Sequence, residues 1–75
     1  MIGYRGMVLR TETGRRTVCY RGPIRDSWYR AAKDARLYAL GRWGAARTVY
    51  LRERRDIQLW AARVYGPAPD QGNLL

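Results

Sequence analysis

Arginine is the residue type through which this chain has most scope for chemistry. Fourteen of its fifteen basic residues are Arg, they face only six carboxylates, and the formal net charge is +9. A guanidinium group donates paired, planar hydrogen bonds to phosphate or carboxylate oxygens and stays charged at any physiological pH. Such an excess of positive charge in 75 residues repels itself unless something anionic offsets it. The composition therefore predicts a binding surface for an anionic partner.

The residues that carry most enzyme chemistry are scarce. Histidine is absent, which removes the commonest general acid-base group and metal ligand near neutral pH. The carboxylates are scattered: Glu53 and Asp56 bracket a charged turn, and Asp34 has the spacing to pair with Arg30 on a helix. Cys19, the only cysteine, is expected to be a small buried hydrophobe. We therefore predict no enzymatic activity, no catalytic residue, no metal and no cofactor.

Two strands joined by a tight turn are expected at the start of the sequence. Residues 1–10 and 15–21 carry β-branched and aromatic side chains around the turn TETG, in which Gly14 can take positive φ. Gly3 and Gly6 weaken the first strand and indicate a bulge or a close approach of another backbone. Strict alternation in the second strand separates two sets of side chains: Val18 and Tyr20 on one face, and Thr17, Cys19 and Arg21 on the other.

A helix is expected over SWYRAAKDARLYAL, capped by Asp26 or Ser27 and ended by Gly41. One face of this helix is apolar and rich in small residues. It holds Trp28, Ala31, Ala32, Ala35, Tyr38 and Ala39. Four alanines would let the helix lie close to a sheet, and Trp28, Tyr38 and Trp60 are expected to point inward.

The second half of the chain predicts a strand over residues 46–52, a turn at ERRD and an ambiguous segment over 57–65. We favour a strand for 57–65 because Ile, Trp, Val and Tyr dominate its bulk. The fold class is then α+β: a small antiparallel sheet with one helix packed on one face, in the order ββαββ, with ββαβα as the alternative. We expect one compact domain over residues 1–65 and a flexible tail over 66–75.

The arginines fall into two predicted binding clusters. One surrounds the first turn and the strand after it, and the other surrounds the turn at residues 53–56. Their members are Arg10, Arg15, Arg16 and Arg21 in the first, and Arg47, Arg52, Arg54 and Arg55 in the second. Aromatic side chains suited to base stacking or to an interface are Tyr4, Tyr20, Tyr29, Trp43 and Tyr50.

Two partner classes fit this pattern. Arginine on a hairpin and a turn suits nucleic acid, which is the first hypothesis. The alternative is an interaction protein of phage or mobile-element type that, as anti-CRISPR inhibitors do, binds an acidic surface of a host complex handling nucleic acid. A third option is a homodimer whose interface is the apolar patch formed by Tyr29, Leu37 and Leu40. Without a signal-like or membrane-spanning apolar run, we expect a cytoplasmic protein with no membrane partner, or one inside the host cell if phage-encoded.

Overall fold

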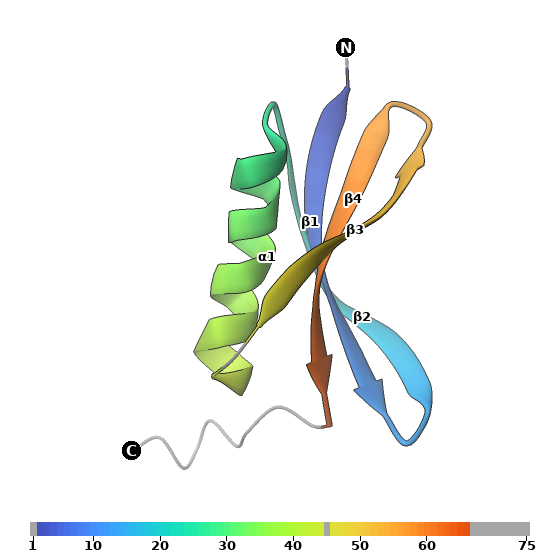
Figure 1. Ribbon diagram of the computed structural model, residues 1–75, viewed down its shortest axis with the longest axis vertical. Helices are drawn as coiled ribbons and strands as arrows, with labels where there is room; N and C mark the ends of the chain where they lie inside the picture. Colours follow the sequence, from blue (N-terminus) through green and yellow to red (C-terminus); the bar gives the residue numbers. More distant parts are fainter. Residues whose placement is uncertain (1, 45, 67–75) are drawn as a thin grey trace.

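The computed structural model describes residues 2–44 and 46–66 and shows a four-stranded sheet with one helix against one face (Figure 1). The elements are β1 (Gly3–Glu12), β2 (Arg15–Arg25), α1 (Trp28–Trp43), β3 (Arg47–Arg54) and β4 (Ile57–Tyr65). The α+β class and the order ββαββ are confirmed, and residues 57–65 form a strand rather than a helix. Apart from Gly66, the predicted tail lies outside the described residues. Within the described part, no helix is long and apolar enough to cross a membrane.

The sheet has the strand order β2-β1-β4-β3. The β1–β2 and β3–β4 pairs are antiparallel hairpins, as expected, but the central pair β1–β4 is parallel. Every connection, including the helix, reverses the direction of the chain, so the first and last strands must run the same way (Figure 1). The two hairpin turns therefore lie at opposite ends of the sheet.

Both hairpin turns contain backbone in the left-handed region. Gly14 has φ 79°, as predicted for the first turn, and Thr13 before it has φ 49°. In the second turn the left-handed residue is Arg55, with φ 57°. A residue with a side chain is disfavoured there by roughly 1–2 kcal/mol. Both turns thus hold a side chain in a conformation that glycine adopts freely.

The core lies where small side chains let α1 approach the sheet. The four predicted alanines of α1 are buried, and they pack against strand residues that include Val8 and Ala62. Gly6 on β1 faces the first turns of the helix, where a Cβ atom would overlap the carbonyl oxygen of Ala31. The close approach indicated by Gly6 is therefore confirmed, and it fixes how near the helix lies to β1.

Stacked aromatic rings flank this alanine core. Tyr20 of β2 stacks on Tyr38 of α1 with ring centroids 4.3 Å apart. Trp28 stacks on Trp60 of β4 at 4.8 Å. Tyr38 and Trp60 are half-buried, in keeping with their expected inward positions, but Trp28 is 49% exposed. It covers the outer side of Trp60 at the start of the helix instead of entering the core.

The helix differs in three details from what its sequence predicts. It continues past Gly41 to Trp43, because Gly44 (φ 77°) is the left-handed residue and donates its N–H to the Leu40 carbonyl. Ser27 occupies the N-cap position, as expected, but makes no side-chain capping hydrogen bond. Asp34 accepts two hydrogen bonds from Arg25, at 2.7 and 3.0 Å, rather than pairing with Arg30. It does so because the end of β2 brings Arg25 alongside the helix.

Candidate functional site

The two faces of the sheet differ in charge. Cross-strand partners share a face, so the register separates a covered face, against α1, from an open face. The open face carries seven strand arginines: Arg5, Arg16, Arg21, Arg47, Arg52, Arg54 and Arg63. The two strand carboxylates, Glu12 and Glu53, pair with Arg15 and Gln58 on the covered face. Among the described strand residues, the open face therefore has arginine and no acid.

A bulge in β2 brings Arg21 to the open face together with Val18. Val8 pairs with Tyr20 and Leu9 with Val18, so one residue, Cys19, is inserted between them. The prediction that Val18 and Tyr20 share a face is wrong, because this extra residue reverses the alternation. Tyr20 faces the helix, whereas Val18 and Arg21 face away from it.

A groove of about 370 Å³ lies on the open face near the β3–β4 turn. Five arginines line it: Arg5 from β1, Arg21 from β2, and Arg52, Arg54 and Arg55 from β3 and the turn. Its floor is apolar and consists of Met7, Val18, Ile57 and Leu59. All four strands and one turn contribute, so the groove exists only in the folded sheet. It joins members of both predicted arginine clusters and adds Arg5, a hairpin arginine that was assigned to neither cluster although it shares the alternation of Met7.

The groove arginines have no carboxylate partner in the described part of the chain. The ion pairs found there are Arg10–Glu12 and Arg25–Asp34, and both lie on the covered side. The Nε atom of Arg5 is buried and makes no hydrogen bond. An unsatisfied buried donor is costly, and like charges without counterions repel. The groove is thus a site of concentrated positive charge with hydrogen-bonding capacity unused within the described residues.

Farther along the same face, Arg47 lies directly opposite Arg63 on the neighbouring strand. Both side chains are exposed. Like charges in directly opposed strand positions destabilise a sheet. This pair extends the positive surface from the groove toward the other end of the open face.

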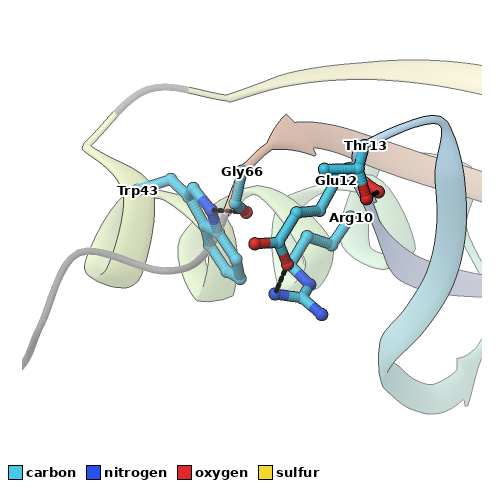
Figure 2. A network of polar contacts seen from close by, with 5 residues as sticks. All are labelled: Arg10, Glu12, Thr13, Trp43 and Gly66. Carbon is cyan, nitrogen blue, oxygen red and sulfur yellow. Dashed lines mark hydrogen bonds and ion pairs between the residues drawn. The ribbon is translucent and has the colours of Figure 1, made fainter.

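The first hairpin turn lies at the opposite end of the sheet from the β3–β4 turn (Figure 1). Its arginines divide between the two faces. Arg16 is on the open face, whereas Arg10 and Arg15 are on the covered face. Figure 2 shows that Arg10 already forms an ion pair with Glu12, at 2.8 Å. Of the first predicted cluster only Arg21 therefore lines the groove; Arg10, Arg15 and Arg16 lie apart from it, and Arg10 is partly neutralised.

The predicted stacking residues are not in the groove. The register places Tyr4, Tyr20 and Tyr50 on the covered face, and Tyr29 belongs to the helix. Trp43 is half-buried, and its indole N–H donates to the carbonyl oxygen of Gly66 at 3.3 Å (Figure 2). Of the described strand aromatics, the alternation puts only Tyr65, at the end of β4, on the open face. The groove therefore offers charge and aliphatic surface, without a stacking platform.

Cys19 is half-buried beside the core, and its thiol lies 3.6 Å from the Val8 carbonyl oxygen. Desolvation raises the pKa of the Cys19 thiol, against smaller opposing effects that include the charge of Arg10. A raised pKa favours the protonated thiol, which is a poor nucleophile. Within the described residues, no three His, Cys, Asp or Glu side chains are grouped so that they could hold a metal ion.

No protein-family model, curated protein sequence or solved structure matches the chain.

Proposed function

We propose that this protein is a non-enzymatic binding module that holds nucleic acid on the open face of its sheet. The observation that carries the proposal is the separation of charge by face: seven strand arginines on the open face and no strand carboxylate there. The phosphate backbone of a nucleic acid carries an extended row of negative charges, which suits arginines spread over four strands. Bound phosphate oxygens accept hydrogen bonds from the guanidinium groups and remove their mutual repulsion.

The composition of the groove favours contact with the sugar-phosphate backbone over reading of bases. Its five arginines surround aliphatic side chains, and the aromatic rings lie elsewhere. Phosphate contacts position a nucleic acid without carrying sequence information. We therefore expect binding that depends strongly on salt and weakly on sequence.

The test is a titration of the purified protein with a 20-bp DNA duplex, its single strand and the matching RNA over a salt series. Each phosphate contact on duplex DNA contributes about −0.9 to the slope of log K against log salt. Five groove arginines each on a phosphate give a slope of about −4.5. An absence of binding to all three probes at low salt would refute the proposal.

A matched pair of double variants locates the contact. Arg52→Gln with Arg54→Gln removes two groove charges, and Arg30→Gln with Arg36→Gln removes two charges from the helix. The Arg52/Arg54 variant should reduce the slope of log K against log salt by about 1.8. It should weaken binding about 60-fold at 0.1 M salt, because each phosphate contact contributes a factor near 10^0.9 to the binding constant at that salt concentration. The helix pair should change both far less. Equal losses from the two pairs would mean that net charge, and not the open face, governs binding.

The apolar floor of the groove favours one second candidate, an acidic protein surface that places an aliphatic side chain between its carboxylates. This is the inhibitor-like alternative, in which the chain occupies the nucleic-acid path of another protein. A pull-down from nuclease-treated lysate separates the two. A specific partner that survives nuclease and is lost with the Arg52/Arg54 variant supports the second candidate, and loss of every partner on nuclease treatment removes it.

A further inference from the structure

The helix covers only part of the face against which it packs. α1 contacts β1, β4 and β2 closely and β3 least. A helix with its side chains is about 10–12 Å wide, whereas strands lie about 4.8 Å apart, so one helix shields little more than two strands. β3 is an edge strand, and the space beside α1 above it is left without a covering element in the described part of the chain.

That space is a groove of about 340 Å³ between α1 and β3. Its apolar lining comes mainly from Trp28, Tyr29, Leu37 and Leu40 on the helix. Tyr29 is 60% exposed and Leu37 58% exposed, which is unusual for large apolar side chains in one depression. A second hollow shares Leu40 with the first and continues it to the start of β3. The two together follow the helix from Trp28 to Leu40.

The rim of this groove is basic. Lys33 and Arg36 line it, Arg47 lines its continuation, and none of the carboxylates in residues 2–44 and 46–66 lines either part. A second copy of the chain suits the groove poorly, because each copy carries a net charge of +9. A two-fold contact would also bring the Lys33 and Arg36 of both copies to the same interface. The charge thus favours an acidic occupant.

We infer that the groove between α1 and β3 is a docking site for an acidic amphipathic helix of a partner protein. Such a helix lies beside α1 over β3, buries its apolar stripe on Tyr29, Leu37 and Leu40, and places its acidic residues against Lys33 and Arg36. A 16-residue helix is about 24 Å long, so a partner of similar length matches α1 along the whole groove. The inference is independent of the proposed function, because Lys33 and Arg36 of this groove lie on the opposite side of the sheet from the five arginines that line the groove of the open face.

The experiment uses a displayed library of 16-residue amphipathic helices as the probe. Their apolar stripe is varied, and the flanking positions are drawn equally from Glu and Lys. Selection on the full chain should enrich Glu-flanked helices, and binding should blue-shift the fluorescence of half-exposed Trp28. Leu37→Ala should weaken a selected helix about tenfold or more, as expected for a central apolar anchor. Ile24→Ala is the matched control, because Ile24 is 52% exposed and faces the other side.

Charge reversal makes the test specific for the partner's chemistry. The double variant Lys33→Glu with Arg36→Glu should select Lys-flanked helices instead, while its circular dichroism stays that of the parent. The inference is overturned if no helix is enriched, if selected helices ignore Leu37, or if reversal leaves the flanking preference unchanged. It is equally overturned if sedimentation shows a dimer that Leu37→Glu abolishes, since a second copy then fills the groove. The same holds if a helix binds only after residues 67–75 are removed, since a segment of the chain itself would then be the occupant.

Discussion

Replacement of Gly6 by alanine tests how tightly helix and sheet are joined. A Cβ atom on Gly6 would overlap the Ala31 carbonyl oxygen and press on the Ala31 carbonyl carbon and the Ala35 side chain. The first two of these atoms belong to the helix backbone, so no rotation of a side chain can make room. Either α1 moves away from β1, or β1 is displaced within the sheet. Both responses disturb the packing of the buried alanines around Val8.

The expected cost of Gly6→Ala is about 3 kcal/mol, at the upper end of what forced overpacking costs, because the obstacle is backbone. A 75-residue domain has a total stability of roughly 4–11 kcal/mol, so this is a large fraction. For a domain of this size each kcal/mol lowers the melting temperature by roughly 4–8 °C. We therefore expect the melting temperature of Gly6→Ala to fall by roughly 12–24 °C.

Thermal and urea unfolding followed by circular dichroism measure this change. Gly41→Ala is the control, because Gly41 lies inside α1 and a Cβ there meets nothing within 4 Å. Removing a helix-interior glycine should stabilise the protein by roughly 0.5–1 kcal/mol. The reasoning is refuted if Gly6→Ala stays within about 0.5 kcal/mol of the parent, because the helix would then not be held against β1 at this point.

Three further predictions follow from single sites. Arg55→Gly relieves the positive φ of the second turn and should raise the free energy of unfolding by about 0.5–1 kcal/mol. It should also weaken nucleic-acid binding about 8-fold at 0.1 M salt, because Arg55 lines the groove. Thr13→Gly should stabilise the protein similarly in a melting experiment without affecting binding. Cys19 should react with iodoacetamide more slowly in the folded than in the unfolded chain near neutral pH. Because the pKa of Cys19 is raised in the folded chain, the contribution of Cys19 to stability is present below the ordinary thiol pKa and is lost as the pH rises through the folded pKa. Urea titrations over this pH range should show the loss in the parent protein and not in Cys19→Ser. Asp34→Asn breaks the two hydrogen bonds from Arg25 and should lower the melting temperature, less so at high salt, whereas a melting temperature equal to that of Asp26→Asn would contradict this role.

Local sequence chemistry predicted most of the elements because each one carries its own signal. The alanine stripe of α1 has a helical period, and its four alanines are the residues buried against the sheet. Gly14 likewise predicted the turn between β1 and β2, and bulky side chains predicted that residues 57–65 form a strand. The end of the helix was predicted too early because Gly41 and Gly44 look alike in sequence, and only the left-handed backbone of Gly44 distinguishes them.

The candidate site was less predictable because it depends on pairing between distant strands. The basic groove needs the parallel register of β1 and β4, which sets Arg5 beside Leu59. It also needs the bulge at Cys19, which moves Arg21 to the open face. No residue type in β2 predicts that bulge. The alternation of charge was visible within each strand, but its agreement across strands appears only once the register is known.

The parallel contact between β1 and β4 has a consequence for how the chain folds. Residues 3–11 pair with residues 57–65, so the centre of the sheet is made from segments near the two ends of the described chain. The hairpins and the helix are local and can form early, but this contact closes a long loop and contributes only after that entropy is lost. We expect the β1–β4 pairing to be the slow step of folding. During synthesis, the unpaired inner edge of β1 stays exposed until residue 65 has emerged, which makes β1 the segment most in need of protection from aggregation before the fold is complete.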